Sequence, residues 1–432
     1  MTLLNSNYYE GEPMKLVKLS LVAAMAAGTF SALDAKPLEE AIKDVDVSGA
    51  LRYRFDQASW GKSENATFGK YGIGANNIPH KFRAFVTPSI SAGDGFKVVG
   101  QLMYNNDGNG GWASGTNAAL TTTKQEVVLK QAYLQYDLAD AGVSVLYGKQ
   151  QLNTIWTADF TGMAAKVLIT PTQGFTVAAF GVDSFEGVEG DGDASKLVGS
   201  KYDKNMYGAA VLANVAGLDA QVWGAYWDNV ATLYAANLKY TLGLGGGNNV
   251  GVKVTYLGNT IQTAANQAGI KDGTLVDGRV FAKFAGLDAQ VGGIFYGDKN
   301  GATLHTLEDI SGPDLYIGRE MFYAENTALV DSLGQSVFGY VGVGYTLPMD
   351  LRVGVQGVFG QNTQAQVTDD RKDTRIEGVF ELGYKVNKNL SLEGWYSYIN
   401  SNVKDGKVGA DGKVEDLKQD KSTVRLQALY KF

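Results

Sequence analysis

The last eleven residues of this 432-residue chain restrict its fold more than any other segment. From Ser422 to Phe432, apolar or aromatic residues take every second position, and polar residues such as Arg425 mostly fill the positions between them. Alternation of this kind is typical of a strand whose two faces meet different surroundings. A soluble edge strand can show it too, but an apolar face that ends the chain on an aromatic residue favours a closed barrel, in which the last strand pairs with the first.

The other end of the chain indicates export. Residues 14–18 (MKLVK) are basic, residues 19–32 are apolar, and residues 33–35 (LDA) offer a cleavage site, an order typical of a secretory signal peptide. Residues 1–13 carry two glutamates ahead of the basic stretch, so we interpret them as an extension upstream of the true start. The expected parts are therefore an extension at 1–13, a signal peptide at 14–35 and a barrel at 36–432.

A membrane span in this chain has to be made of strands. The apolar run at 19–32 is too short to cross a bilayer as a helix, and no later segment has the roughly 18 uninterrupted apolar residues that a helix needs. The chain has 55 glycines, 23 tyrosines, 7 prolines and no cysteine, and no linker separates two domains. The sequence therefore predicts an all-β fold, a transmembrane antiparallel β-barrel.

Short turns give the number of strands. Eight tight turns, rich in Gly, Asp and Asn, divide the chain into nine hairpins, which predicts about 18 strands with the short turns facing the periplasm. The turns are at 93–95, 139–142, 172–174, 216–219, 243–249, 285–288, 348–350 and 387–389. The longer, polar connections are expected to be extracellular, and they are at 58–79, 106–124, 186–204, 259–276, 298–334 and 401–421.

Several motifs along the mature chain resemble those of the Campylobacter-type major outer membrane porin family. They are PLEEAIKDVDVSGALRYRFD (37–56), GKQQLNTIW (148–156), AAFGVDSF (178–185), AYWDNVA (225–231), FYGDK (295–299), FGYVGVGYTL (338–347) and STVRLQALYKF (422–432). GKQQLN and STVRLQALYKF are much more specific than barrel alternation alone. The long connections depart most from the family pattern.

The resemblance implies a homotrimeric general porin of eighteen strands with a calcium ion at its constriction. In the family the side-chain ligands lie on the third and seventh extracellular loops, here 151–163 and 298–334, and the matching carboxylates are Asp159 and Glu308. Carboxylate oxygens are suitable calcium ligands. The alternative, that both are solvated loop acids without an ion, stays open.

Charged residues suggest how the lumen is lined. Inward-facing arginines are expected to form a basic wall near the closure seam, and they are Arg52, Arg54, Arg352, Arg375 and Arg425. Opposite them, Asp159, Glu308 and Asp309 on inward-folded loops would complete a transverse field at the constriction that orients polar solutes. A simpler interpretation is that these arginines only keep the interior hydrated and pair with acids.

These features predict a passive diffusion channel for ions and small hydrophilic solutes in the bacterial outer membrane. The acidic loops and the formal charge of −7 favour a slight cation preference. Outer-membrane lipid, lipopolysaccharide and host-surface ligands are expected partners, and nucleic acid is not. The alternatives are a surface-exposed structural barrel or adhesin with a plugged lumen, and a substrate-specific channel. An enzyme is not expected, because His80 and His305 are the only histidines and neither completes a triad, although either could act as a general base.

Overall fold

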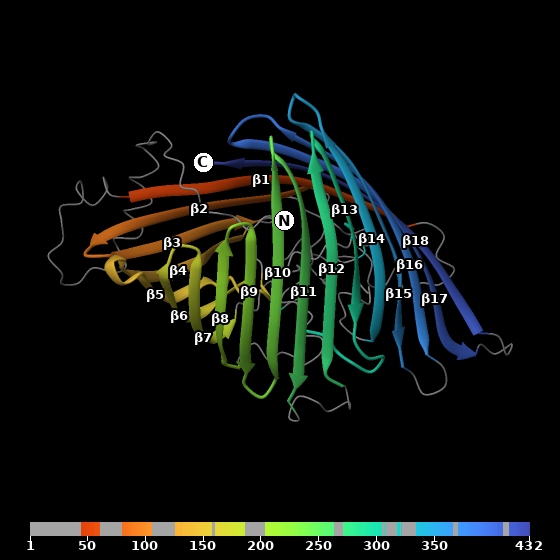
Figure 1. Ribbon diagram of the computed structural model, residues 1–432, viewed down its shortest axis with the longest axis horizontal. Coiled ribbons are helices and arrows are strands. Elements are labelled where there is room, and N and C mark those ends of the chain that lie inside the picture. Colours follow the sequence, from red (N-terminus) through yellow and green to blue (C-terminus); the bar gives the residue numbers. More distant parts are fainter. Residues whose placement is uncertain are drawn as a thin grey trace.

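The computed structural model describes residues 45–60, 80–105, 126–157, 160–185, 204–262, 271–304, 307, 318–319, 321, 334–365, 370–408 and 414–432. The expected N-terminal extension and signal peptide lie outside these ranges, as do most residues of the long connections. Eighteen strands form one antiparallel sheet (Figure 1). They are β1 (Val45–Trp60), β2 (His80–Gly93), β3 (Phe96–Asn105), β4 (Glu126–Leu138), β5 (Val143–Gln151), β6 (Thr161–Thr172), β7 (Phe175–Phe185), β8 (Met206–Val215), β9 (Leu218–Trp227), β10 (Ala231–Gly245), β11 (Asn248–Ile261), β12 (Gly273–Phe284), β13 (Leu287–Tyr296), β14 (Gln335–Thr346), β15 (Leu351–Gln364), β16 (Arg371–Lys385), β17 (Leu390–Val408) and β18 (Val414–Lys431).

The sheet closes on itself, as the C-terminal alternation predicts. Each strand pairs with the next one in the sequence, and β18 pairs with β1 over the register from Ala50 opposite Lys431 to Trp60 opposite Lys421. The backbone groups of Gly49 and Phe432 exchange two hydrogen bonds, with N···O distances of 2.9 and 3.1 Å. Closure leaves no open edge of backbone donors and acceptors, which is the condition for a sheet to survive in lipid.

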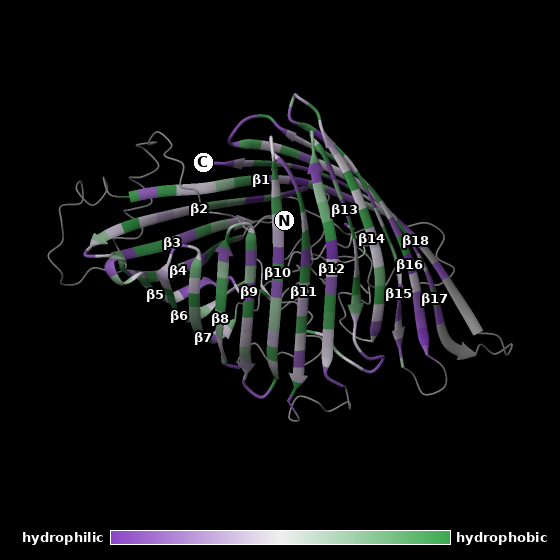
Figure 2. Cartoon of the chain, viewed as in Figure 1, coloured by the Kyte–Doolittle hydropathy of each residue, from purple (hydrophilic) through white to green (hydrophobic). Residues whose placement is uncertain are grey.

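The two faces of the sheet differ as the alternation predicts. On β1 the side chains of Leu51 and Tyr53 are exposed at 40% and 44%, whereas Arg52 and Arg54, at the alternate positions, are half-buried. Large exposed apolar residues recur at every second position on β11, β16 and β17, among others, and the strands are banded in hydrophobic and hydrophilic colours along their lengths (Figure 2). The outer face therefore suits lipid and the inner face suits a polar lumen.

The short turns join strands at one end of the barrel. All eight predicted turns are found between paired strands, from the β2–β3 turn at Gly93–Gly95 to the β16–β17 turn, and a single 3-10 turn, Ala139–Ala141, joins β4 to β5. Glycines with positive φ, such as Gly95 at 84°, allow several of them. No helix in the described ranges is long and apolar enough to cross a membrane.

One expected connection is wrong in extent. Residues 401–421 were expected to be a loop, but β17 and β18 continue through most of this range, with Ser401 opposite Gln419 and Val408 opposite Val414. The apolar alternation is lost there while the backbone hydrogen bonds continue. A hairpin that rises above the lipid no longer needs an apolar face, so hydropathy cannot mark where its pairing ends.

Candidate constriction of the barrel lumen

The described parts of two connecting segments fold into the barrel instead of standing above it. Residues 152–160 join β5 to β6, and residues 297–334 join β13 to β14. Seven large apolar side chains in the described parts of both are at most 3% exposed, which a surface loop could not achieve; they are Leu152, Ile155, Trp156, Phe160, Leu304, Leu307 and Met321. Apolar burial inside the barrel therefore pulls these segments inward.

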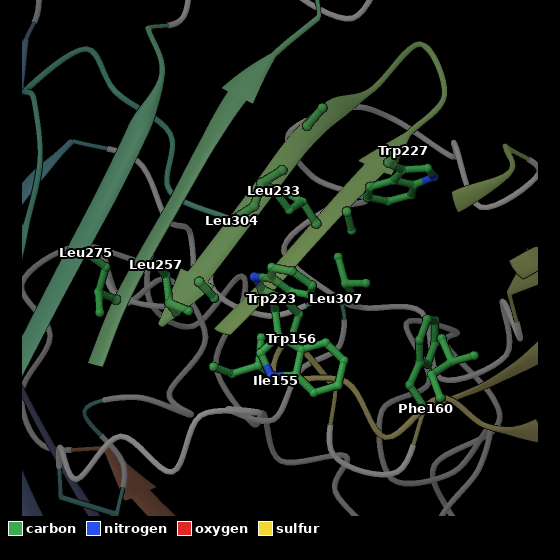
Figure 3. Packing of buried hydrophobic residues seen from close by; sticks show 14 of the residues in the cluster. Ile155, Trp156, Phe160, Trp223, Trp227, Leu233, Leu257, Leu275, Leu304 and Leu307 are labelled. Atoms are coloured by element: carbon green, nitrogen blue, oxygen red, sulfur yellow. The ribbon is translucent and has the colours of Figure 1, made fainter. Parts of the chain in front are cut away.

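The inward face of β8 to β12 receives this apolar cluster. Figure 3 shows Ile155, Trp156, Leu304 and Leu307 beside side chains that the strands point into the barrel, including Trp223 on β9, Leu233 on β10, Leu257 on β11 and Leu275 on β12. The rings of Trp156 and Trp223 meet edge to face with their centroids 6.2 Å apart. Packed apolar groups fill this side of the lumen. The open passage is therefore confined to the opposite side.

Direct hydrogen bonds join the two segments to each other and to the wall. The N–H of Leu307 donates to the carbonyl oxygen of Trp156 at 2.9 Å. The fully buried amide of Asn259 on β11 donates to the carbonyl of Ala302 at 3.0 Å and accepts from the N–H of Leu304 at 2.8 Å. A side-chain amide that satisfies two backbone groups of one segment fixes its height on the wall.

A second attachment holds the β13–β14 connection to β16. The carboxylate of Glu377, only 1% exposed, accepts the N–H groups of Arg319 and Met321 at 3.0 and 2.9 Å and the hydroxyl of Ser397 at 2.6 Å. Gly318 has φ of +74°, and a Cβ there would lie 2.1 Å from a Glu377 oxygen, so glycine is required for this approach. The connection is thus held against both β11 and β16.

The guanidinium of Arg319 strengthens the same attachment. It contacts Glu381 through Nε at 2.6 Å and Glu393 on β17 through Nη2 at 3.2 Å. Glu381 also accepts from Arg352 at 3.2 Å and from the amide of Gln356 at 2.5 Å. Glu381 is nearly buried, so its several donors offset the cost of removing a carboxylate from water.

Ionic contacts tie down the root of the β13–β14 connection. The Asp298 carboxylate accepts the N–H of Asn300 at 2.9 Å and pairs with Lys271 at 3.0 Å. The backbone hydrogen bond from Asn300, and then the ammonium of Lys271, lower the pKa of Asp298 below its ordinary value. The next residue, Lys299, forms an ion pair with Asp370 beside β16. These contacts lie where the connection leaves β13, and as exposed ion pairs they add only a modest restraint there.

The predicted arginines all face inward, but they fall into two groups. Arg52, Arg54 and Arg425 lie together at the closure seam, where Arg425 contacts Asp56 at 2.5 and 3.0 Å. The other two, on β15 and β16, are held by carboxylates on β13 and β16: Arg352 by Asp288 at 2.7 Å and by Glu381, and Arg375 by Asp373. Arg352 lies next to a short turn and Arg375 near the opposite end of β16, so these two do not share one height with the seam group.

The predicted acidic residues Asp159, Glu308 and Asp309 lie outside the described residues. In the described ranges no group of three or more His, Asp or Glu side chains is arranged to hold a metal ion. His305 is also outside them, while the His80 ring is stacked on Tyr53 and tilted against Phe55 on the outer face, with its Nδ1 2.6 Å from the Tyr53 hydroxyl. His80 therefore does not face the lumen.

Several residues of this region were not predicted as site residues from the sequence. Arg319, Glu377, Glu381 and Glu393 connect the inward segment to the wall, and Lys81 and Arg83 extend the basic group at the seam onto β2. Lys81 and Arg83 could have been found, because they alternate with Phe82 and Ala84 in the period of a strand. The partners of Arg319 could not, because they are 58 to 74 residues away in the sequence.

Comparison with known proteins agrees with this architecture. No curated protein sequence matches the chain. Among solved structures, OccAB3 of Acinetobacter baumannii superposes with a TM-score of 0.67 at 11% identity over 90% of this chain and 100% of that one. OccK10 (OpdN) of Pseudomonas aeruginosa gives a TM-score of 0.64 at 11% identity over 90% and 99% of the two chains, and OpdL of the same organism gives 0.62 at 14% over 90% and 99%. At such identities the likeness shows the barrel fold alone.

The model of the family described as Campylobacter major outer membrane protein matches residues 14–432. The chain therefore belongs to the Campylobacter major outer membrane protein family, a family of the bacterial outer membrane.

Proposed function

We propose that this porin-like barrel is a general diffusion channel for ions and small hydrophilic solutes. The observation that carries the proposal is a closed barrel whose lumen is narrowed on one side by apolar segments and lined on the other by charged side chains. A polar, partly narrowed passage admits hydrated solutes by size and resists apolar ones. Single-channel recording of the purified protein in planar bilayers tests this, and steady conductance steps are expected.

A slight preference for cations belongs to the same proposal. It is supported by the formal charge of −7 and by the position of Asp159, Glu308 and Asp309 in the sequence of the two inward-folding connections. Carboxylates at a constriction raise the local concentration of cations. The reversal potential under a KCl gradient measures the preference, and a potential on the chloride side would refute it.

A calcium ion held by Asp159 and Glu308 is the proposed structural cofactor. The neighbouring described residues suit it, because Leu307, directly before Glu308, donates its N–H to Trp156, which stands three residues before Asp159. The hydrogen bond joins the two connections at points adjacent to both carboxylates in the sequence. Calcium bound there would neutralise the two acids and cross-link the connections.

Assembly and surface contacts are proposed from the family. We infer a homotrimer in contact with outer-membrane lipid and lipopolysaccharide, with host-surface ligands meeting its outer connections. Conductance steps that occur in threes, together with cross-linking of the detergent-extracted protein to a trimer, would support the trimer. Monomeric protein that conducts in single steps would refute it.

A second candidate function is a surface-exposed structural barrel or adhesin with a plugged lumen. The observation that favours it is the packed apolar cluster inside the barrel, which contains five fully buried aromatic side chains. These are Trp156, Phe160, Trp227, Tyr296 and Tyr340, each 2% exposed or less. A bilayer that stays silent after confirmed insertion would favour this function over the diffusion channel.

A further inference from the structure

Two lysines face each other on the outside of the barrel, near the ends of β16 and β17 that lie away from the short turns. In the register of these strands Lys372 is directly opposite Lys404, and both side chains are exposed. The neighbouring residues Asp373 and Val403 are buried on the inner side, so both lysines point outward. Side chains directly opposite each other have Cβ atoms about 4.5–5.5 Å apart, and like charges there are destabilising. We call Lys372 and Lys404 the lysine pair.

No described residue neutralises the lysine pair. Neither ammonium group makes a hydrogen bond or an ion pair within the part of the chain that the structure describes. Strands β14 and β15 contain no Asp or Glu, and all three acids of β16 are buried on the inner side. By contrast, Lys149, an outward lysine of β5, donates to the carbonyl oxygen of Leu129 at 2.9 Å. The lysine pair is therefore available to a ligand from outside the barrel.

The nearest acids lie on the β18 side of the lysine pair. In the register Asp416 is directly opposite Lys404, and Asp420 is opposite Asn400. Between these two aspartates along β18 lies a third exposed lysine, Lys418. The three lysines outnumber the two aspartates, and the excess of positive charge is greatest towards β15, where acids are absent from the whole strand.

The lysine pair stands above the part of the barrel that faces lipid. Large exposed apolar side chains on the outer face extend as far as Ile376 on β16 and Tyr398 on β17. Lys372 is four residues from Ile376, and Lys404 is six residues from Tyr398. At about 3.3 Å per residue and a strand tilt of about 40°, the pair lies roughly 10–15 Å above these apolar residues. The flexible lysine stems let the ammonium groups reach down to the headgroups of the lipids.

Uncharged polar side chains surround the lysine pair. Thr363 on β15 is directly opposite Lys372, and Thr374 and Asn402 are opposite each other two residues nearer the lipid. The Oδ1 atom of Asn402 is shielded from solvent and accepts no hydrogen bond from a described residue. A buried acceptor without a donor costs free energy, and a hydroxyl group of a bound ligand would satisfy it. The surface therefore offers cations for a phosphate group and polar groups for a sugar.

We propose that the lysine pair and the polar groups beside it bind the phosphorylated sugar headgroup of a glycolipid in the outer leaflet of the membrane. Clustered lysines at a bilayer surface attract anionic lipid headgroups. One phosphate group between the two ammonium groups relieves their like-charge contact and forms charge-assisted hydrogen bonds with both. The inference rests on the lipopolysaccharide contact in the proposed function, and it assigns that contact to a place on the barrel and to named residues.

Binding of purified lipid A to the full-length protein in zwitterionic detergent micelles tests the site. Diphosphorylated lipid A is titrated while the melting temperature of the barrel is followed. In the Lys372→Gln/Lys404→Gln variant the half-saturating concentration should rise about tenfold or more, because charge-assisted contacts with phosphate are lost. The matched control is Lys385→Gln/Lys388→Gln, which removes two exposed lysines at the short-turn end of the same hairpin and should bind like the wild type. Dephosphorylated lipid A should bind the wild type about tenfold more weakly than the phosphorylated form.

The opposite results would overturn the proposal. These are equal lipid binding by the wild type and the Lys372→Gln/Lys404→Gln variant, an equal loss in the control variant, or an equal effect of inorganic phosphate alone. If the lysine variant keeps its lipid binding but loses its oligomeric state, this face is an interface between copies of the chain and the proposal fails. Gel mobility of unheated samples in SDS verifies that each variant is folded. The lysine pair lies outside the lumen, so absence of single-channel current would refute the diffusion channel and leave the lipid result unaffected.

Discussion

Replacing Glu377 by Gln should release the attachment of the β13–β14 connection to β16 without changing the shape of the side chain. Both carboxylate oxygens are in use: one accepts from Arg319 N and Ser397 Oγ, and the other accepts from Met321 N. A glutamine has one carbonyl oxygen, so its NH₂ group faces a backbone N–H whichever way the amide is turned. The remaining contacts become hydrogen bonds between neutral groups.

The magnitude follows from these contacts. A hydrogen bond to a charged acceptor contributes about 1.5–3 kcal/mol, and a buried donor left without an acceptor costs about 1–3 kcal/mol. We therefore expect the attachment to be weakened by about 2–3 kcal/mol. At 1.4 kcal/mol for each factor of ten, local opening should become roughly 30 to 150 times more frequent.

Hydrogen–deuterium exchange of the detergent-extracted protein measures this opening directly. The peptide that contains Arg319 and Met321 should exchange faster in the Glu377→Gln variant by that factor, while peptides from β1 and β18 keep their protection. Glu393→Gln is the matched control, because the Glu393 side chain is 40% exposed and contacts Arg319 only at 3.2 Å; an exposed pair of this kind contributes at most about 1 kcal/mol. Unchanged exchange in Glu377→Gln, or equal acceleration in both variants, would refute the reasoning.

Three further perturbations address the lumen, the metal and the closure of the barrel. Trp156→Ala should lower the melting temperature, since truncating a buried aromatic residue costs about 3–5 kcal/mol. It should also raise single-channel conductance; an unchanged conductance would contradict the role of the apolar cluster in narrowing the lumen. Asp159→Asn combined with Glu308→Gln should lower the melting temperature and abolish its dependence on a calcium chelator, and a melting curve that stays chelator-sensitive would exclude these ligands. Gly49→Val should hinder closure, because a side chain there would overlap the ring of Phe432; gel mobility of unheated samples in SDS would then show less folded barrel, and a wild-type folded fraction would refute the expectation.

The period-two pattern was enough to predict the barrel itself. In a strand the direction of each side chain depends only on its position, so Leu51, Tyr53 and Arg52 could be assigned to opposite faces without knowledge of any other strand. Turn residues act just as locally, which is why all eight short turns and the count of eighteen strands could be predicted. The pattern failed at 401–421, where pairing continues in strands that carry no apolar face.

The sequence by itself therefore determined the strands, their faces, the turns and the pairing of the last strand with the first, because each depends on neighbours in the chain or on the need to close an edge in lipid. Only the tertiary structure decided what fills the barrel. Trp156 meets Trp223, Arg319 meets Glu377 and Glu381, and Arg52 meets Arg83 across strands that closure and register bring together. Such contacts join residues that are far apart in the sequence, and no local period records them.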